Sequence, residues 1–540
     1  MISGAEIMVK CLEAEGVDIV FGYPGAAICP FYDKIYDSSI THILVRQEQN
    51  AAHAASGYAR CSNRPGVCVA TSGPGATNLI TGIATAYTDS IPIVAITGQV
   101  RSDLLGRDVF QEADITGACE PFVKHSYLVS KTEDLPRVFK EAFHIASTGR
   151  PGPVLIDIPV DIQENEIESF EYPESVNIIG YKPNTKGHAI QVKKAVEAIN
   201  ASKRPVIVSG GGVLSSGIKL KLQKFAETTG IPVISTMMGI GVMPSEHELY
   251  LGMLGTHGKA VANRALHEAD LVIVCGARLG DRAVAAPDQM SENTKVIHID
   301  IDPAEIGKNV KTEIPIVGDM KNVIKMLLDS IGDYKVTTMW SETVKNWKKD
   351  LYREPPVFDG FVEPRTLVGH LSAMFRSKAI LVADVGQNQI WCANNFRIRE
   401  GRFLTTGGMG TMGYSIPAAI GAKFARPDRD VIVICGDGSF QMGLNELATI
   451  AGNQLGIKII IMKNARLGMV RELQDKHYGG RHSATILNGD PDFLKIADAY
   501  GIDHAEAHSN KEAENIIKGI VDSEKPFILV CDVHPDTPSI

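Results

Sequence analysis

The stretch over residues 431–469 constrains the fold of this chain more than any other. Residues 431–435 form a short apolar run rich in β-branched side chains, which is typical of a strand buried in a parallel sheet. Helical spacing follows over residues 440–452, and a second apolar run over residues 457–462 predicts another strand. Strand, helix and strand in this order predict one βαβ unit of a parallel sheet.

A glycine-rich turn, Gly436-Asp437-Gly438-Ser439, follows the first of these strands, and Asn464 follows the second. Asp437 and Asn464 lie 27 positions apart (464 − 437), both just past the carboxyl ends of strands, where open α/β sheets bind ligands. Glycines let a phosphate approach the backbone, and a helix beginning after Ser439 would present free N–H groups to it. Oxygens of Asp437 and Asn464 suit Mg²⁺ on a diphosphate. A plain strand-to-helix turn is the alternative interpretation of a lone GDG motif.

Bulk properties narrow the class of protein. The 540 residues suffice for about three domains. A net charge of −9 argues against general binding of nucleic acid or membrane surfaces, and no apolar run approaches the roughly 20 residues of a membrane span. The first 18 residues resemble an amphipathic helix rather than a targeting peptide, and nine cysteines without a CxxC pair predict reduced thiols. We therefore expect a cytoplasmic protein.

Helix and strand patterns alternate along most of the chain and predict an α/β protein of three doubly wound parallel-sheet domains. We expect these domains at residues 1–165, 189–335 and 361–540, with linkers at 166–188 and 336–360. The first should open with a helix over residues 2–15. In the middle domain, four predicted strands each end in Gly or a small polar residue, which favours a Rossmann-like nucleotide site.

Glu48 begins an Ala-rich helix predicted over residues 48–60. By itself, an acidic residue at this place is explained by the helix dipole. Its neighbourhood favours a functional role, since a GYAR element, TSGPGATN (71–78) and AYTDSIPIVAITG (86–98) follow. These segments, together with the GDG turn and Asn464, resemble the thiamine diphosphate (ThDP) enzymes. The first Asn of that family's motif is replaced here by Lys463.

The resemblance covers nearly the whole chain and is greatest to the family of acetohydroxyacid (acetolactate) synthase large, catalytic subunits. The matching segments are residues 21–27, 106–117, 149–159, 251–258, 276–282, 297–308, 386–391, 410–423 and 467–483. The resemblance implies ThDP, Mg²⁺ and FAD as cofactors, with the flavin in a structural role. It also implies a place for each cofactor. For ThDP the residues are Val385, Gly386, Gln387, Gly410, Met412 as an apolar wedge, Gly436, Gly438 and Ser439; for the metal Asp437, Asn464 and the carbonyl of Arg466; for FAD Arg150, Gly210, Gly211, Thr236, Gly276, Arg278, Asp300 and Asp319.

The same resemblance assigns the reacting residues. Glu48 would contact the aminopyrimidine nitrogen of ThDP and act as its acid–base partner. Phe110 and Gln111 would line the reaction centre, with Gln111 donating to a developing oxyanion. Arg282 would face the carboxylate of the second 2-oxo acid, and Leu473 would line the pocket for that substrate.

The implied reaction decarboxylates pyruvate on ThDP and condenses the resulting hydroxyethyl carbanion with pyruvate or 2-oxobutyrate. The product, 2-acetolactate, belongs to the biosynthesis of isoleucine, valine and leucine. In the family the Glu and the GDG motif of one site come from two subunits, which implies a homodimer or homotetramer; a small regulatory subunit is a further partner to test. The alternatives are another ThDP/FAD enzyme, either pyruvate oxidase or glyoxylate carboligase, and a non-catalytic nucleotide-binding protein. An acidic Glu48 counts against the carboligase.

Five positions depart from the family pattern. The family's Trp, Met, Lys, His and second Gly are replaced by Leu473, Thr256, Val160, Asn388 and Ala26. The loss of the Trp matters most, because an aromatic wall of the second-substrate pocket is removed. We therefore expect a weaker preference for 2-oxobutyrate over pyruvate as acceptor.

Overall fold

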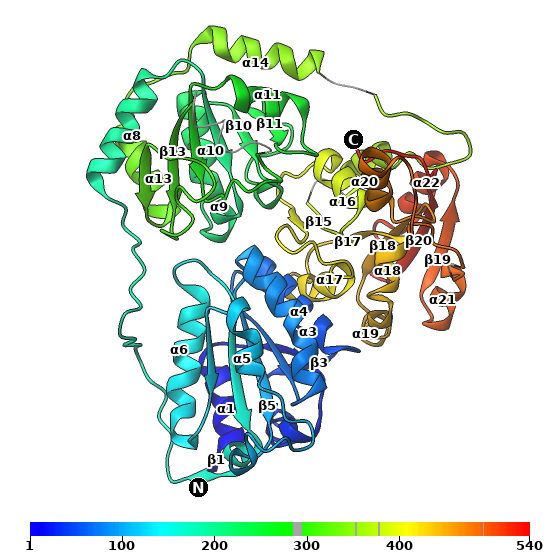
Figure 1. Ribbon diagram of the computed structural model, residues 1–540. Helices are drawn as coiled ribbons and strands as arrows, with labels where there is room; N and C mark the ends of the chain where they lie inside the picture. Colours follow the sequence, from blue (N-terminus) through cyan, green and yellow to red (C-terminus); the bar gives the residue numbers. More distant parts are fainter. Residues whose placement is uncertain (285–293, 352–353, 376–377, 490) are drawn as a thin grey trace.

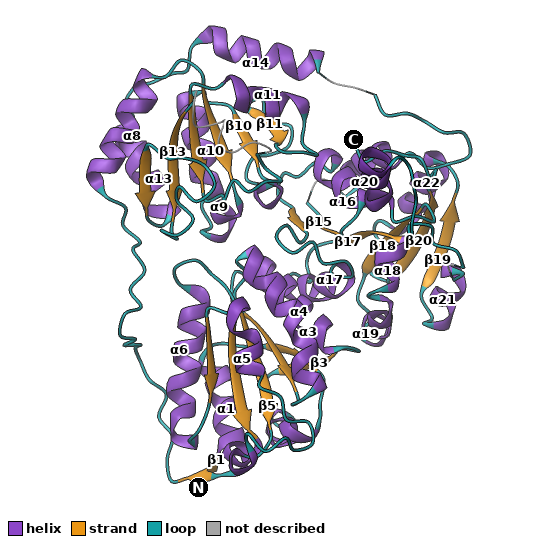
Figure 2. Ribbon diagram, viewed as in Figure 1, coloured by secondary structure: helices purple, strands orange, loops and turns teal. Residues whose placement is uncertain are grey.

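The computed structural model describes residues 1–284, 294–351, 354–375, 378–489 and 491–540. Three six-stranded sheets follow one another along the chain, each parallel throughout and covered by helices (Figures 1 and 2). The predicted fold class is confirmed. Within the described residues, no helix combines the length and apolar character needed to cross a bilayer.

The first sheet has the strand order β3-β2-β4-β5-β7-β6. One of its faces packs on α1 (Gly4–Ala14) and α6 (Leu135–Ser147), and the other on α3 (Glu48–Ser62) and α4 (Pro74–Asp89). Its strands are β2 (Ile19–Gly22), β3 (Thr41–Leu44), β4 (Gly66–Ala70), β5 (Ile93–Gln99), β6 (His125–Leu128) and β7 (Val154–Pro159). Shorter helices are η1 (Ala26–Ile28), α2 (Cys29–Ile35), η2 (Ser102–Leu104), α5 (Ile115–Cys119), η3 (Glu120–Phe122), η4 (Thr132–Asp134) and α7 (Val160–Glu164).

The start of the chain differs from the predicted helix over residues 2–15. β1 (Ile2–Ser3) pairs antiparallel with β8 (Glu166–Ile167), so the helix begins only at Gly4. The Ser3 side chain accepts a hydrogen bond from the Glu6 N–H at 3.2 Å and thereby caps this helix. Because β8 lies in the predicted linker, that segment begins docked on the first domain.

The middle sheet has the order β11-β10-β9-β12-β13-β14. Two of its strands, β11 and β14, are not among the four strands predicted for this domain. The strands are β9 (Pro205–Ser209), β10 (Val233–Ser235), β11 (Tyr250–Met253), β12 (Leu271–Cys275), β13 (Lys295–Asp300) and β14 (Ile314–Val317). The helices are α8 (Ala189–Ala201), α9 (Gly211–Ser215), α10 (Lys219–Thr229), η5 (Met237–Gly239), α11 (Ala260–Glu268) and α13 (Met320–Ser330).

A helix, α14 (Thr338–Asp350), occupies most of the predicted second linker. It packs on the middle domain, since Trp340 and Val344 are buried in one of that domain's cores. The Trp340 indole N–H also donates to the Pro205 carbonyl at 3.1 Å. Residues 352–353 of the predicted linker lie outside the described residues.

The third sheet has the order β16-β15-β17-β18-β20-β19. Its strands are β15 (Ile380–Ala383), β16 (Arg402–Leu404), β17 (Val431–Gly436), β18 (Ile457–Lys463), β19 (Asp503–Ala507) and β20 (Phe527–Asp532). Its helices are α15 (Pro364–Met374), α16 (Gln387–Asn395), α17 (Ser415–Ala425), α18 (Asp437–Gln441), η6 (Leu444–Glu446), α19 (Leu447–Gly452), α20 (Gly468–Tyr478), α21 (Phe493–Ala499) and α22 (Asn510–Ile520).

The helix predicted after the GDG turn is wrong in two respects. It begins at Asp437 rather than after Ser439, and it is broken into α18, η6 and α19. Gly443 leaves helical geometry between the pieces, with φ −126° and ψ 5°. The break places the buried Glu446 where its carboxylate accepts from the Arg46 N–H at 2.8 Å and the Asn50 amide at 2.9 Å. A tertiary contact with the first domain therefore replaces one continuous helix.

Helices α3 and α17 join the first and third domains in one continuous apolar core. They pack closely because glycines stand at the crossing. A Cβ atom built on Gly57 would lie 2.0 Å from the Ala418 carbonyl oxygen, and one on Gly421 would lie 1.8 Å from the Ala54 oxygen. Only glycine permits this approach. The crossing therefore fixes the position of α3, which begins at Glu48, relative to α17 and the loop that precedes it.

Candidate active site

Two loops lie side by side at the carboxyl edge of the third sheet. β15 and β17 are hydrogen-bonded neighbours, and each runs into a helix, α16 after Gly386 and α18 after Gly436. Gly386 has φ 143°, in the region that favours glycine. Asn388 links the loops, because its amide nitrogen donates to the Asp384 carbonyl at 2.7 Å and the Ile434 carbonyl at 3.3 Å. The first-turn N–H groups of two helices thus start at one edge, where an anion can be bound.

The structure brings Asp437, Asn464 and Arg466 together at this edge. Asp437 is 1% exposed, and its Oδ2 accepts hydrogen bonds from the N–H groups of Asn464 at 3.0 Å and Ala465 at 2.6 Å. The Asn464 Oδ1 accepts from the Arg466 N–H at 3.1 Å. Ala465 adopts a positive φ of 52°, which turns the chain sharply here. A carboxylate and an amide oxygen at one such edge are of the kind that suits a hard divalent cation.

Lys463, which replaces the first Asn of the family motif, is turned to other partners. Its ammonium lies 3.3 Å from the Asp532 carboxylate and 3.6 Å from that of Glu506. His508 also bonds Asp532, at 2.7 Å. The replacement by Lys463 therefore leaves both Asp437 and Asn464 in place as candidate metal ligands.

Asp384 is a site residue that sequence reasoning missed. It is 1% exposed and accepts hydrogen bonds from the N–H groups of Gly413 at 3.0 Å and Ser415 at 2.9 Å, and from the Ser415 hydroxyl at 2.6 Å. Burial raises the pKa of its carboxyl to about 6, although these hydrogen bonds oppose the shift. These contacts fix the loop that carries Gly410 and Met412. A Cβ atom built on Gly438 would lie 3.7 Å from the Met412 Cε, so this side chain reaches the GDG turn.

Glu48, Phe110 and Gln111 lie on the first domain. Glu48 begins α3, and its Oε2 accepts from the Asn78 amide of α4 at 2.9 Å. Gln111 has φ 60° and packs on Gly73, because a Cβ atom built on Gly73 would lie 2.8 Å from the Gln111 Cβ. Phe110 is 87% exposed. Among the described residues of one chain, no hydrogen bond links these three to the GDG turn.

The residues expected to hold FAD lie largely on the carboxyl edge of the middle sheet. They follow β9 (Gly210, Gly211), β10 (Thr236), β12 (Gly276, Arg278) and β14 (Asp319), and Asp300 ends β13. Burial raises the pKa of Asp300 to about 6. Arg150 comes from the first domain and reaches this edge, where it pairs with Glu305 at 2.7 Å and Asp302 at 3.4 Å. The Asp319 carboxylate already caps α13 by accepting from the Lys321 N–H at 2.7 Å.

Arg282, in the middle domain, and Glu472, which precedes Leu473 on α20, both act electrostatically on His257. Burial lowers the pKa of the His257 imidazole; the charge of Glu472 opposes this shift, and those of Arg282 and Lys476 reinforce it. Leu473 is half exposed on α20, and Arg282 is exposed. The middle and third domains therefore meet at this point, where the Asn394 amide donates to the His257 carbonyl at 2.8 Å.

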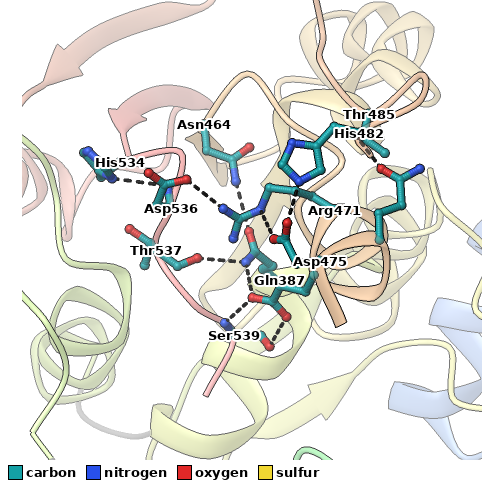
Figure 3. Close-up of polar contacts among 12 residues, drawn as sticks. Gln387, Asn464, Arg471, Asp475, His482, Thr485, His534, Asp536, Thr537 and Ser539 are labelled. Carbon is teal, nitrogen blue, oxygen red and sulfur yellow. Dashed lines mark hydrogen bonds and ion pairs between the residues drawn. The ribbon is translucent and has the colours of Figure 1, made fainter. Parts of the chain in front are cut away.

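Residues 536–539 form a polar network with α16 and α20, in which Thr537 and Ser539 are buried and which no sequence pattern indicated (Figure 3). The Gln387 Nε2 donates to the Glu472 carboxylate at 2.7 Å and to the Thr537 carbonyl at 2.8 Å. Its Oε1 accepts from the Asn464 Nδ2 at 3.0 Å. Glu472 also accepts from the Ser539 N–H at 2.7 Å and hydroxyl at 2.6 Å. The side chain of Gln387 is thus directed into the protein.

Comparison with known proteins agrees with this arrangement. Three models of the thiamine pyrophosphate enzymes match the chain: the N-terminal TPP binding domain at residues 2–118, the central domain at 192–327 and the C-terminal TPP binding domain at 384–531. A probable acetolactate synthase large subunit of Methanocaldococcus jannaschii is 47% identical, covering 99% of this chain and 92% of the relative. The acetolactate synthase large subunit of Haemophilus influenzae is 45% identical, covering 93% and 89%. That of Corynebacterium glutamicum is 46% identical, covering 93% and 82%.

Proposed function

We propose that this chain is the catalytic chain of an acetolactate synthase. The premise is that the chain belongs to the thiamine pyrophosphate enzyme family and, within it, to the acetolactate synthase large subunits. The enzyme decarboxylates pyruvate and condenses the two-carbon remainder with a second 2-oxo acid, pyruvate or 2-oxobutyrate, to give 2-acetolactate. Pyruvate oxidase and glyoxylate carboligase are not favoured, because relatives over almost the whole chain are named acetolactate synthase.

One observation carries the proposal: the pair of Asp437 and Asn464 beside two helix starts. Hard oxygen ligands for Mg²⁺ and N–H groups for a diphosphate are what ThDP binding requires. We assign the metal to Asp437, Asn464 and the Arg466 carbonyl. We assign the diphosphate to the backbone of two turns. One consists of Val385, Gly386 and Gln387, and the other includes Gly436, Gly438 and Ser439.

The chain's own side chains complete the chemistry. ThDP held there would supply a nucleophilic carbon for the pyruvate carbonyl and a thiazolium ring as the sink for the electron pair that CO₂ leaves behind. Glu48 exchanges a proton with the aminopyrimidine nitrogen, and its hydrogen bond from Asn78 orients the carboxyl group for this role. Gln111 donates a hydrogen bond to the developing oxyanion, with Phe110 beside it. Arg282 binds the carboxylate of the acceptor, whose pocket Leu473 lines.

FAD is proposed as a second cofactor on the middle domain. Its support is the edge where five neighbouring parallel strands end, with glycines at Gly210, Gly211 and Gly276. Gly276 has φ 57°, and a Cβ atom there would lie 2.8 Å from the Gly212 Cα, so the turns after β9 and β12 pack backbone against backbone and expose main chain rather than side chains at this edge. A nucleotide can therefore approach the main chain closely.

The assembly is proposed to be at least a homodimer. Its support is that, among the described residues of one chain, Glu48 bonds Asn78 and Gln111 packs on Gly73, both within the first domain, so the GDG turn that completes the site is assigned to a second copy. A homotetramer is the larger alternative. Relatives named large subunits also imply a small regulatory subunit as partner.

The test is an assay of purified protein with pyruvate, ThDP and Mg²⁺ under nitrogen, with the flavin spectrum recorded. We expect acetolactate together with an FAD absorption band, and loss of acetolactate in Glu48→Gln. Glu514→Gln is the matched control, because Glu514 pairs with His370 and has no part in the proposed site. Acetolactate without flavin would remove the FAD assignment. Peroxide formation in air without acetolactate would refute the proposed activity.

A further inference from the structure

The polar network around Gln387 orients its side-chain amide (Figure 3). A side-chain amide has an oxygen that only accepts and an NH₂ group that only donates. Both groups of Gln387 have partners: Nε2 lies 2.7 Å from the Glu472 Oε1 and 2.8 Å from the Thr537 oxygen, and Oε1 lies 3.0 Å from the Asn464 Nδ2. Carboxylate and carbonyl oxygens accept but cannot donate. They therefore determine which end of the Gln387 amide faces them.

The orientation of Gln387 in turn determines that of Asn464. Because the Gln387 oxygen faces Asn464, the Asn464 amide presents its NH₂ group to it, and its own oxygen points the opposite way, where it also accepts from the Arg466 N–H at 3.1 Å. That oxygen is the proposed metal ligand. If Gln387 were reversed, two NH₂ groups would face each other, or Asn464 would turn its nitrogen towards the cation and lose its hydrogen bond from the Arg466 N–H. Gln387 is 3% exposed and Asn464 is 8% exposed, so water cannot easily relieve such a conflict.

Glu472 is itself held by the chain. Ser539, 4% exposed, donates both its N–H at 2.7 Å and its hydroxyl at 2.6 Å to this carboxylate. Nearby, the Arg471 guanidinium pairs with Asp536 at 2.8 Å, and the Trp391 indole donates to the Pro538 carbonyl at 2.9 Å. Residues 536–539 are thus fixed on α16 and α20 at several points.

We propose that Glu472 is a positioning residue whose acceptor oxygens, fixed by Ser539, orient the Gln387 amide and through it turn the Asn464 oxygen towards the divalent cation. This inference rests on the proposed function, because it takes Asn464 as a ligand of Mg²⁺ bound with ThDP. Glu472 touches neither the metal nor the substrate in this scheme. Glu472 acts by fixing which end of the Gln387 amide faces Asn464, and thereby which end of the Asn464 amide faces the cation.

The test is calorimetric titration of the full-length, cofactor-free protein with Mg²⁺ at saturating ThDP. Glu472→Leu and Glu472→Ala remove the charged one of the two acceptors that face the Gln387 Nε2 and should weaken Mg²⁺ binding about tenfold, the loss expected for a hydrogen bond to a charged group. Glu472→Gln keeps an acceptor for Gln387 and should remain within about threefold of wild type. In a Gln387→Leu background, Glu472→Leu should have no further effect.

The matched control is Trp391→Phe, which removes one contact to residues 536–539 but leaves both amides in place. It should lower the melting temperature without changing the affinity for Mg²⁺. Equal binding by wild type, Glu472→Leu and Glu472→Ala would overturn the inference alone. So would equal loss in Glu472→Gln and Glu472→Leu, because charge rather than acceptor polarity would then act. Failure of wild type to bind Mg²⁺ with ThDP would overturn the proposed function as well.

Discussion

Replacing Gly421 by Ala tests how the first and third domains are held together. The added Cβ atom would lie 1.8 Å from the Ala54 carbonyl oxygen and 2.8 Å from the Tyr58 nitrogen. Real Cβ atoms essentially never approach closer than 3.0 Å, so α17 and α3 must separate by at least about 1.2 Å (3.0 − 1.8). Both neighbours are backbone atoms of a helix, which cannot move aside individually.

The sign of the effect follows from two opposed contributions. Alanine favours a helix over glycine by about 1 kcal/mol. Overpacking a close-packed core costs about 1–3 kcal/mol, and this contact is at the severe end because it displaces a whole helix. We expect a net loss of about 2 kcal/mol, which lowers the melting temperature by about 4–8 °C for domains of this size.

The assay is calorimetric melting of Gly421→Ala beside Gly519→Ala. Gly519 lies in α22, and an added Cβ atom there would have no atom within 4 Å. The same substitution should therefore leave the melting temperature unchanged or raise it. If Gly421→Ala were as stable as wild type, the close crossing of α3 and α17 would be refuted as the contact that joins the domains.

Three further predictions concern chemistry and pH. Glu48→Gln should lose acetolactate formation by at least about 100-fold, as expected for a general acid–base group, while calorimetry still detects ThDP binding; retained turnover would exclude Glu48 from proton transfer. Leu473→Trp should raise the preference for 2-oxobutyrate over pyruvate about 10-fold in a competition assay, because a lost pocket contact is worth about 1–3 kcal/mol; an unchanged product ratio would contradict this. Burial raises the pKa of Asp157 from 3.8 to about 7, although Thr97 and Gln99 donate hydrogen bonds to it. The folded state favours the protonated carboxyl of Asp157, so its contribution to the free energy of unfolding is fully present below about pH 4. This contribution is lost, by about 4 kcal/mol, as the pH rises through 7. Asp157→Asn should lack that loss in urea unfolding measured at pH 4.5 and 7.5, and parallel pH profiles would contradict the assignment.

Local pattern was enough to predict the α/β class and the strand ends that form the candidate site. Residues 431–435 and 457–462 read as buried strands, and they are neighbouring strands of one parallel sheet. The 27-residue spacing of Asp437 and Asn464 therefore placed both at one edge, where the Asn464 N–H bonds the Asp437 carboxylate. Such features depend on residues close in sequence, whose periodicity records which face is buried.

Tertiary contacts decided what that periodicity cannot record. The helix predicted over residues 440–452 is broken because Glu446 bonds Arg46 and Asn50, about 400 positions away in the chain. The orientation of Gln387 depends on Thr537, 150 positions away, and on Glu472, 85 positions away. Which end of an amide faces a neighbour is a property of the surrounding donors and acceptors, and only the folded chain brings these together. The sequence by itself therefore determined the edge at which the site lies, and the tertiary structure decided how its side chains are aimed.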